Sequence, residues 1–271
     1  MRVLVLGFGL ALAACAPKPA AVKLYAMECG RFDVSDMSVF ADNHALDAQK
    51  RTLIVTCYLI RHPKGDLLWD AGIPDAAAAQ AEGVTEGPFH ITVPRTLASQ
   101  LAEIGVKPGE IEYFAISHSD FDHVGNAPLF AATAKFLSNP AERAHMLRDE
   151  AKQWPAVELL QKSATIDVAT DHDVFGDGSV MMLQTPGHTP GHMSLLVRLK
   201  KTGPVLLTGD LYHTLEARAQ KLVPTFNTDR GETLVSMEKF EKLAAETKAG
   251  VVIQHRLEDF EALPHAPAFL D

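Results

Sequence analysis

The sequence predicts a layered α/β protein, in which helices and strands pack around one core. The first indication is composition. Apolar residues make up 47% of the 271 residues and charged residues 22%, which is enough apolar material for a sizeable core. The second indication is the order of the predicted elements along the chain. Strand-like hairpins come first, and two successive stretches of mixed strands and helices follow them. We therefore expect a single domain over residues 23–271.

The net charge and the hydropathy of the chain argue against two classes of function, nucleic-acid binding and membrane spanning. The net charge of −9 argues against nucleic acid, because phosphate binding requires clustered Lys and Arg. No run of about 18 apolar residues occurs, so no membrane-spanning helix is expected. A small molecule is the expected partner, and the sequence leaves the oligomeric state open.

Residues 1–14 (MRVLVLGFGLALAA) are expected to form a signal peptide, in which Arg2 precedes about a dozen apolar residues. The segment ends in Leu-Ala-Ala-Cys, which resembles the bacterial lipobox, so Cys15 is expected to carry a lipid anchor. Residues 15–22 then form a flexible tether. These features predict an exported, periplasmic, membrane-anchored lipoprotein. The alternative is a plain signal peptide with an incidental cysteine.

The two remaining cysteines, Cys29 and Cys57, lie in or beside strand-like segments. An exported chain meets an oxidising compartment, in which two thiols are able to pair. From the sequence, a disulfide between them and two buried free thiols both remain open.

The first elements are predicted from β-branched residues and turn signals. Residues 23–27 and 52–61 (TLIVTCYLIR) are typical of strands, and residues 67–70 form a further strand. The segment 62–66 (HPKGD) between the last two strands is a turn, so we expect this pair to form a hairpin.

The middle of the chain mixes helices, strands and loops. The Ala-rich residues 75–83 predict a short helix, and residues 87–93 (GPFHITV) a loop with exposed apolar residues. Helical spacing of apolar residues predicts a helix over 96–104. Residues 140–153 also read as a helix, and the apolar segment 111–116 is expected to be a buried strand.

The last third of the chain continues this mixture. Short apolar segments predict strands over 180–183, 193–199, 205–207 and 251–254. An amphipathic helix is expected over 230–247, because its apolar residues recur at helical intervals.

Histidines and carboxylates gather directly after the predicted strand 111–116. His118, Asp120, Asp122 and His123 lie within six residues. Imidazole and carboxylate are the groups that bind Zn²⁺ and similar divalent ions, and a turn after a strand can point several of them into one cavity. We therefore interpret this segment as part of a metal site.

Three further segments each end a strand or a stiff turn with one candidate ligand. His188 lies in a turn rich in Pro and Gly, Asp210 follows the strand 205–207, and His255 follows the strand 251–254. Strands and stiff turns hold ligands from distant parts of a sequence in a fixed geometry. Together, the four segments predict one metal centre.

In this order, the segments resemble the metal-binding pattern of the metallo-β-lactamase superfamily, a His-x-His-x-Asp-His motif followed by His, Asp and His. Residues 70–72 (DAG) are similar to an early Asp-x-Gly turn of that family, and the resemblance covers residues 50–260. It implies an α/β fold, the four-layer αβ/βα sandwich of these metallo-hydrolases. Residues 57–60, 125–126 and 185–192 also resemble the branch that opens N-acyl homoserine lactones.

The resemblance implies two divalent metal ions, and Zn²⁺ is the first expectation. The ions would make a bridging hydroxide available near neutral pH, polarise the substrate carbonyl and hold the departing atom. Asp122 would orient the hydroxide and then pass a proton to the leaving group. The implied ligands are His118, Asp120 and His188 for the first metal, Asp122, His123 and His255 for the second, and Asp210 as the bridge.

Position 120 departs from the family pattern, because Asp120 stands where the family usually has histidine. A carboxylate makes the first site harder and more anionic, so Fe²⁺ or Mn²⁺ become alternatives to Zn²⁺. The sequence leaves three outcomes open: an altered binuclear site, a site with only the second metal, or a weakly active protein.

Five more residues have auxiliary or open roles. The resemblance implies that a tyrosine just beyond the bridging Asp hydrogen-bonds the substrate carbonyl. Tyr212 is the candidate, although the family's tyrosine usually lies three residues after the bridging Asp, where this sequence has His213. Asp70 is expected to brace a ligand histidine from behind, and His192 to lie beside the ligands. Arg256 is expected to be a solvated charge, with a contact to a substrate carboxylate as the alternative.

The leading hypothesis is a metal-dependent lactonase that opens N-acyl homoserine lactones by attack of a metal-bound hydroxide, with Phe89 and Ile91 beside the acyl chain. A metallo-β-lactamase is the alternative enzyme, because both reactions attack a strained cyclic carbonyl. A hypothesis of another class is a weakly active or non-catalytic metal-binding module, because Asp120 interrupts the motif. A small lactone or lactam is thus the expected substrate.

Overall fold

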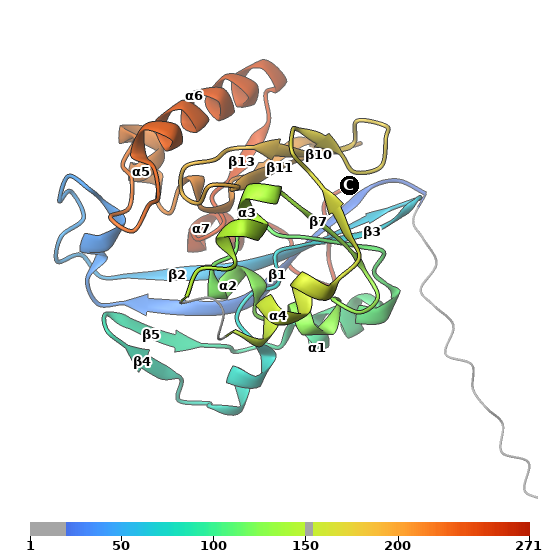
Figure 1. Ribbon diagram of the computed structural model, residues 1–271, viewed down its shortest axis with the longest axis horizontal. Helices are drawn as coiled ribbons and strands as arrows, with labels where there is room; N and C mark the ends of the chain where they lie inside the picture. Colours follow the sequence, from blue (N-terminus) through green and yellow to red (C-terminus); the bar gives the residue numbers. More distant parts are fainter. Residues whose placement is uncertain (1–19, 150–153) are drawn as a thin grey trace, which may run out of the picture.

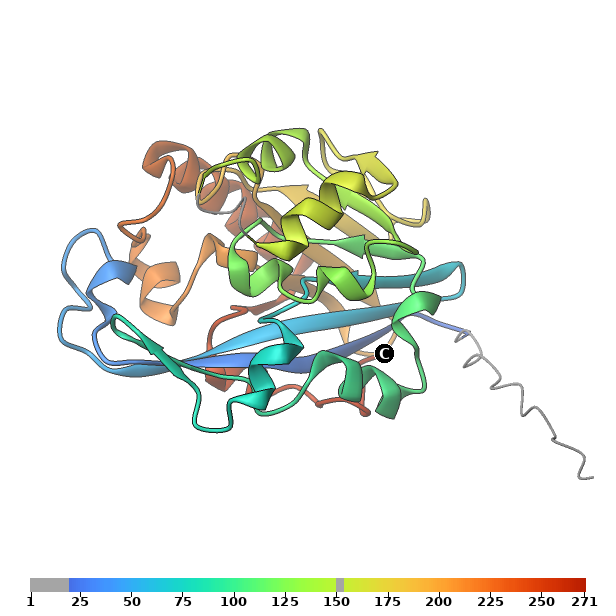
Figure 2. The same cartoon turned by 60° about the horizontal axis from the view of Figure 1, so that its bottom comes forward.

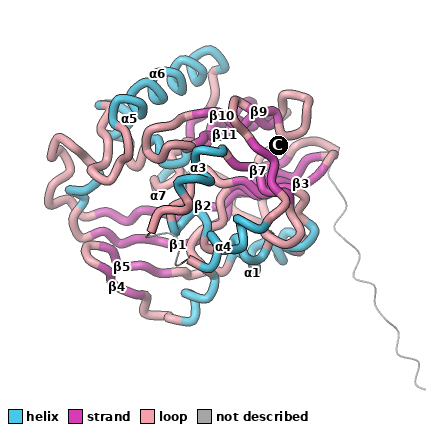
Figure 3. Tube along the Cα trace, in the orientation of Figure 1, coloured by secondary structure: helices cyan, strands magenta, loops and turns pink. Residues whose placement is uncertain are grey.

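Two β-sheets lie face to face at the centre of the molecule, and helices cover the outer face of each sheet (Figures 1 and 2). The computed structural model describes residues 20–149 and 154–271. Figure 3 distinguishes the strands of the two sheets from the helices by colour. This arrangement is the four-layer αβ/βα sandwich that the sequence predicts.

The first sheet consists of β1 (Lys23–Val34), β2 (Arg51–His62), β3 (Gly65–Trp69), β4 (Val84–Glu86), β5 (Phe89–Thr92), β6 (Tyr113–Ala115), β7 (Lys135–Ser138) and β8 (Thr165–Asp167). Its spatial order is β4-β5-β1-β2-β3-β6-β7-β8. The long strands β1 and β2 pair antiparallel, and β2 continues into β3 as the predicted hairpin. β3, β6, β7 and β8 run parallel to one another.

The second sheet consists of β9 (His172–Asp173), β10 (Val180–Gln184), β11 (Met193–Leu199), β12 (Gly203–Leu207) and β13 (Gly250–Val252). Its spatial order is β13-β12-β11-β10-β9. The pair β12 and β13 is parallel, and the other neighbours are antiparallel. Two parallel strands therefore end at the same edge of this sheet, as they do in the first sheet.

The helices of the described residues are α1 (Leu97–Ile104), α2 (Phe121–Val124), α3 (Pro140–His145), α4 (Pro155–Lys162), α5 (Leu215–Gln220), α6 (Arg230–Thr247) and α7 (Leu257–Glu261). Side-chain caps set the beginnings of α1 and α6, because Thr96 and Asp229 each accept a backbone N–H from the first turn. α6 has the predicted bounds. Within the described residues, no helix is long and apolar enough to cross a membrane.

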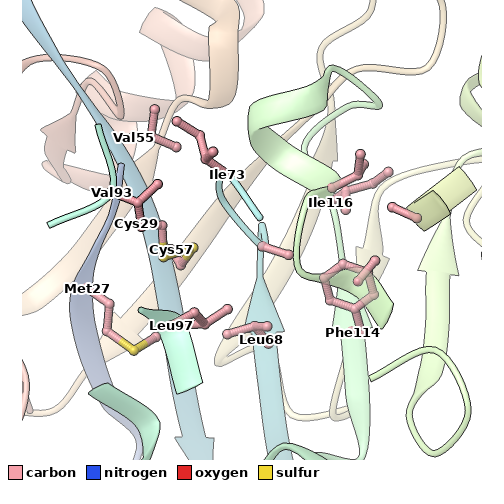
Figure 4. Packing of buried hydrophobic residues seen from close by; sticks show 14 of the residues in the cluster. Met27, Cys29, Val55, Cys57, Leu68, Ile73, Val93, Leu97, Phe114 and Ile116 are labelled. Carbon is pink, nitrogen blue, oxygen red and sulfur yellow. A yellow bond between two sulfur atoms is a disulfide. The ribbon is translucent and has the colours of Figure 1, made fainter. Parts of the chain in front are cut away.

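Three apolar cores fill the three interfaces between the layers. β2 shows how one strand serves two of them: Val55, Cys57 and Leu59 pack with α1 and α4, whereas Ile54 and Tyr58 pack with the second sheet. This alternation follows from the two-residue period of a strand. The third core lies between the second sheet and α6. Figure 4 shows part of the first core, with side chains from several strands meeting those of α1.

Cys29 and Cys57 form a disulfide inside the first core. Figure 4 shows the bond between the two sulfur atoms, with Ile73 and Leu97 nearby. The cysteines lie on the paired strands β1 and β2, beside a β-bulge in β1. The structure thus contains the disulfide rather than two free thiols.

Several segments differ from the predictions. Residues 87–93 are not a loop, because Phe89–Thr92 pairs with both β1 and β4 and extends the sheet edge. The helix expected over 140–153 ends at His145, after which the chain turns and Arg148 binds Ser119. The short helix expected over 75–83 is a single 3-10 turn over Asp75–Ala79.

The predicted signal peptide (1–14), Cys15 and the first part of the tether lie outside the described residues, as do residues 150–153 of the predicted helix. The first described strand begins at Lys23, directly after the tether.

Candidate metal centre

The candidate ligands lie on loops and on the short helix α2, at one edge of the two sheets. β3 and β6 run parallel, so Asp70 and His118 follow their strands at the same edge of the first sheet. β12 and β13 also run parallel, which brings Asp210 and His255 together beside the second sheet. Loops beyond the carboxyl ends of parallel strands are where α/β proteins usually bind ligands.

The first group of side chains surrounds the Nε2 atoms of His118 and His188. Asp210 Oδ2 lies 3.7 Å from Nε2 of His118 and 3.6 Å from Nε2 of His188. Asp120 Oδ2 lies 3.4 Å and 3.6 Å from the same two nitrogens. Both carboxylates thus face the two histidines, as the ligand assignment for the first metal requires.

The second group consists of Asp122, His123 and His255, with Asp210 again beside it. Asp122 Oδ2 lies 3.7 Å from Nε2 of each histidine, and the two Nε2 atoms are 3.3 Å apart. Asp210 Oδ1 lies 3.3 Å from His123 Nε2 and 3.0 Å from His255 Nε2. Each oxygen of Asp210 therefore faces a different group, which is the geometry of a bridging carboxylate.

The donor atoms of this cluster fit two divalent cations. His118 Nε2 and His188 Nε2 are buried without a hydrogen-bond partner among the described residues. Buried polar atoms are normally paired, so unpaired donors aimed at one space are suited to a cation. Ligand atoms lie within 4.8 Å of one another in three buried groups. These are His118 with His188 and Asp210, Asp122 with His123 and His255, and Asp210 with His213 and His255.

The electrostatics of the cluster keep its bridging carboxylate ionised. Burial alone would raise the pKa of Asp210, but the surrounding histidines, His255 and His123 foremost, hold it well below its usual range. Burial would likewise lower the pKa of His123, but Asp210, Asp122 and Asp70 raise it well above its usual value. Asp210 therefore stays ionised at neutral pH, and its negative charge faces the cluster.

Asp70 braces His123 from behind, as predicted. Its Oδ2 lies 3.0 Å from Nδ1 of His123, and its Oδ1 accepts the backbone N–H of Ser117 at 2.6 Å. The side-chain amide of Gln254 also donates to Oδ2, at 2.9 Å. A proton on Nδ1 directed to Asp70 leaves Nε2 of His123 to face the cluster.

His192 supports the backbone of the bridging residue. Its Nε2 accepts the backbone N–H of Asp210 at 2.9 Å, so its proton lies on Nδ1, 2.9 Å from the carbonyl oxygen of Thr185. Burial, together with the nearby His118 and His188, lowers the pKa of His192 well below its usual value. His192 is therefore neutral and lies beside the ligands, in agreement with the expectation.

Glu142 is a supporting residue that the sequence analysis did not identify. Its buried Oε1 accepts the backbone N–H of Ser119 at 2.7 Å and the Ser119 hydroxyl at 2.6 Å. Its Oε2 accepts the Thr189 hydroxyl at 2.6 Å and the Gly191 N–H at 3.1 Å. One carboxylate thus ties the loop of His118 to the loop that follows His188. In the sequence, Glu142 looks like an ordinary charged residue of a helix.

The expectation that Tyr212 lies in the site is wrong in this structure. Its ring packs against Phe240 of α6, and its hydroxyl donates to Glu241 at 3.1 Å. His213 lies there instead, with Nε2 2.9 Å from Asp210 Oδ2 and its ring stacked on His255. The signal in the sequence that pointed to His213 was its position three residues after Asp210, which is the usual position of the family's tyrosine.

Arg256 follows His255 in the chain but belongs to the start of α7. It forms ion pairs with Asp259 and Glu258, both in the first turn of that helix. Its guanidinium is half-buried, with about a quarter of the side chain exposed (27%). Arg256 is therefore a paired charge of α7 rather than the solvated charge that was expected, and its ion pairs lie outside the metal cluster.

A cavity of about 910 Å³ opens over the cluster. Its polar part beside the cluster is formed by Asp120, Asp122, Asp210, His213 and His255, and Glu86 is a further charged residue of the lining. Its remaining walls are largely apolar and include the side chains Phe32, Phe40, Leu53, Phe89, Ile91, Phe121, Trp154 and Phe226. Phe89 and Ile91, predicted to line a groove, do border the cavity. The arrangement places an apolar chamber directly beside the ionisable groups.

The family model of the metallo-beta-lactamase superfamily matches residues 51–255, from the first residue of β2 to the last candidate ligand. The chain belongs to the metallo-beta-lactamase superfamily. This membership agrees with the four-layer fold and with the resemblance seen in the ordered histidines and carboxylates.

Relatives of this superfamily member carry one activity in their names. N-acyl homoserine lactonase AttM of Azorhizobium caulinodans is 29% identical over 229 residues, which cover 80% of this chain and 87% of the relative. N-acyl homoserine lactonase AiiA of Bacillus thuringiensis subsp. kurstaki is 28% identical over 256 residues, covering 92% and 98%. A solved N-acyl homoserine lactone hydrolase, with the product N-hexanoyl-L-homoserine at its catalytic metal center, has a TM-score of 0.77 and 27% identity, and the match covers 92% of this chain and 99% of that one.

Proposed function

We propose that this protein is a metal-dependent lactonase that opens N-acyl homoserine lactones. The observation that carries the proposal is the position of the metal cluster at the polar end of a largely apolar cavity. An acyl homoserine lactone has the same division, with a polar ring at one end and a hydrocarbon chain at the other. Relatives named N-acyl homoserine lactonase support this substrate class over a β-lactam.

Two divalent cations, first of all Zn²⁺, would activate a water molecule and polarise the lactone carbonyl. The carboxylate at position 120 keeps Fe²⁺ and Mn²⁺ as alternatives in the first position. Asp122 borders the cavity and lies between His123 and His255. It is therefore placed to take the proton of the attacking water and to return it to the departing ring oxygen.

His213 borders the same cavity and takes the role that Tyr212 was expected to have. Burial lowers the pKa of His213 to about 4, so its ring is neutral at physiological pH and carries one N–H. In the free protein, Nε2 lies 2.9 Å from Asp210 Oδ2, so this N–H would turn from the carboxylate to the substrate carbonyl oxygen when the lactone binds. The apolar walls would bury the acyl chain, at about 0.8 kcal/mol per methylene group.

Turnover of competing substrates tests the proposal. Protein loaded with Zn²⁺ is assayed on N-hexanoyl homoserine lactone and, in parallel, on nitrocefin, with Asp210→Ala as the inactive control. We expect the lactone to be opened and Asp210→Ala to lose this activity. Hydrolysis of nitrocefin alone would contradict the proposal and favour the β-lactamase alternative. Two bound metals with no turnover of either substrate would favour a non-catalytic module.

We also propose that the chain is exported and anchored by a lipid on Cys15. The apolar segment 1–14 supports this, as does the Cys29–Cys57 disulfide, because disulfides are typical of oxidising compartments. Fractionation of bacteria that express the full chain or the Cys15→Ser variant tests it. We expect the wild-type chain in the membrane fraction and the variant outside it. Wild-type protein in the cytoplasm would contradict the proposal.

A further inference from the structure

Asp120, the residue that departs from the family motif, is held by a second side chain. Nη2 of Arg148 donates to Asp120 Oδ1 at 2.6 Å. The other carboxylate oxygen, Oδ2, lies 3.4 Å from His118 Nε2 and 3.6 Å from His188 Nε2. One oxygen is therefore bound to a guanidinium while the other faces the two histidines of the first metal position.

A local capping role does not account for this geometry. Asp120 precedes the first residue of α2, where an aspartate commonly accepts a backbone N–H of the first turn. Within the described residues, its carboxylate makes no such capping bond. Instead, the carboxylate forms an ion pair with the Arg148 guanidinium.

Arg148 is itself held in a fixed orientation. Nη1 donates to the Ser119 hydroxyl at 3.0 Å, and Nη2 donates to the Ser119 carbonyl oxygen at 3.2 Å. The guanidinium also lies over the Trp154 ring, 5.3 Å from its centroid. Ser119 is in turn bound to the buried Glu142. A planar guanidinium with several fixed partners loses little further freedom when it binds a carboxylate.

The ion pair between Arg148 and Asp120 changes the net charge of the first metal position. With neutral histidines, a first position made of three histidines and Asp210 carries one negative charge. The replacement of one histidine by Asp120 adds a second negative charge at the same place. Arg148 brings one positive charge to within hydrogen-bond distance of Asp120, which restores the original balance.

We propose that Arg148 is a positioning residue for the first metal. It holds Asp120 in the orientation that presents a single oxygen to His118 and His188, and it offsets the added charge. The chain thereby keeps two metal positions although the motif lacks a histidine. This inference rests on the metal centre of the proposed function and is independent of its substrate.

Metal binding without substrate tests this inference. The affinity of each of two Zn²⁺ equivalents is measured on the full chain by competition with a coloured chelator. Arg148→Ala is expected to weaken one equivalent by about tenfold or more and to leave the other unchanged. The matched control is Arg143→Ala, because Arg143 lies on neighbouring α3 and pairs with the exposed Asp167. We expect wild-type affinities for this control.

A double-variant cycle separates ion pairing from general damage to the loop. Asp120→His supplies the family ligand and removes the charge that Arg148 offsets. Arg148→Ala is therefore expected to weaken binding in the wild-type background and to have little effect in the Asp120→His background. Arg148→Gln, which retains polar contacts to Ser119, replaces Arg148→Ala in the cycle if circular dichroism shows that the alanine variant is unfolded.

Three outcomes would overturn the inference alone. The first is equal metal affinity in Arg148→Ala and wild type. The second is tighter metal binding in Arg148→Ala, which would mean that Arg148 competes with the metal. The third is an equal loss of metal affinity from Arg148→Ala in the wild-type and Asp120→His backgrounds. Wild-type protein that binds fewer than two equivalents would contradict both the metal centre and this inference. Two bound equivalents without lactone turnover would contradict only the proposed substrate and would leave the expected Arg148 effect in place.

Discussion

Two adjacent residues beyond Asp210 face opposite sides of their loop, and this decides which of them reaches the cavity. Tyr212 packs into the core under α6, whereas His213 contacts Asp210 and borders the cavity. The sequence alone leaves this choice open, because both residue types are able to donate a hydrogen bond. The direction of each side chain depends on the backbone of the turn after β12, which is not encoded in a local pattern.

Because His213 borders the cavity and Tyr212 does not, substitutions at the two positions are expected to change kcat/KM unequally. His213→Ala is expected to lower kcat/KM for an acyl homoserine lactone by at least about tenfold, since it removes a donor at the reacting carbonyl. Tyr212→Phe is expected to leave kcat/KM within about twofold, because its hydroxyl binds only Glu241 on the far side. Steady-state kinetics of the two variants checks this, and the reverse order of effects would contradict the assignment.

Asp70 acts on the cluster through His123. Asp70→Asn is expected to weaken binding of the second metal by roughly 10- to 100-fold, because the imidazole loses the carboxylate that fixes its orientation. Chelator competition measures this loss. Asp177→Asn is the control, because Asp177 pairs with His62 outside the cluster. Unchanged metal affinity in Asp70→Asn would show that Ser117 and Gln254 orient His123 without it.

At the scale of secondary structure, the sequence predicts the loops that carry the ligands better than the residues that hold those loops in place. His118, Asp210 and His255 each follow a short apolar strand, so their place at a strand end is readable from local composition. Glu142 and Arg148 have no such signal, because both look like ordinary charges of the predicted helix 140–153. Their partners are brought to them only by the packing of α3 against the loops. The strand β5, which lies between the edge strand β4 and β1, was likewise missed because it depends on pairing with β1.

The close approach of α2 to the turn after β3 gives a prediction for Gly125. A Cβ at this position would lie 2.4 Å from the backbone oxygen of Gly72 and 2.4 Å from Pro74. Gly125→Ala is therefore expected to displace α2, to lower the free energy of unfolding by about 1–3 kcal/mol and to weaken metal binding through Asp122 and His123. Urea unfolding and chelator competition measure the two effects.

The matched control for this substitution is Gly109→Ala, since a Cβ there would have no neighbour within 4 Å. Its free energy of unfolding is expected to stay within about 0.5 kcal/mol of wild type. Equal behaviour of the two alanine variants would contradict the idea that packing against the turn positions α2.

At the scale of the whole molecule, the four layers hold the metal cluster where the edges of both sheets meet. Ligands come from the loop after β6, from the helix α2 that follows it and from three loops of the second sheet. The cluster therefore depends on the contact between the sheets, which the second core maintains through residues such as Trp69 and Leu207. The sequence predicts this architecture through family resemblance, because local patterns alone indicate only a layered α/β protein.

The Cys29–Cys57 disulfide is expected to stabilise this architecture as a whole. It closes a loop with a sequence separation of 28 residues, for which the chain-entropy relation gives about 3–4 kcal/mol. A Cys29→Ala, Cys57→Ala double variant should lose about this much unfolding free energy in urea, compared with oxidised wild type. An unchanged unfolding midpoint would contradict a stabilising role.

The most direct test of the central claim follows the product of one reaction in heavy-oxygen water. Zn²⁺-loaded protein is incubated with N-hexanoyl homoserine lactone, and the product is analysed by mass spectrometry before and after chelation. The account predicts ring-opened N-hexanoyl homoserine with an intact amide and one heavy oxygen atom in its new carboxylate. It also predicts that chelation abolishes the product and that added Zn²⁺ restores it. Cleavage of the amide instead of the ring, or turnover that persists without metal, would contradict the account.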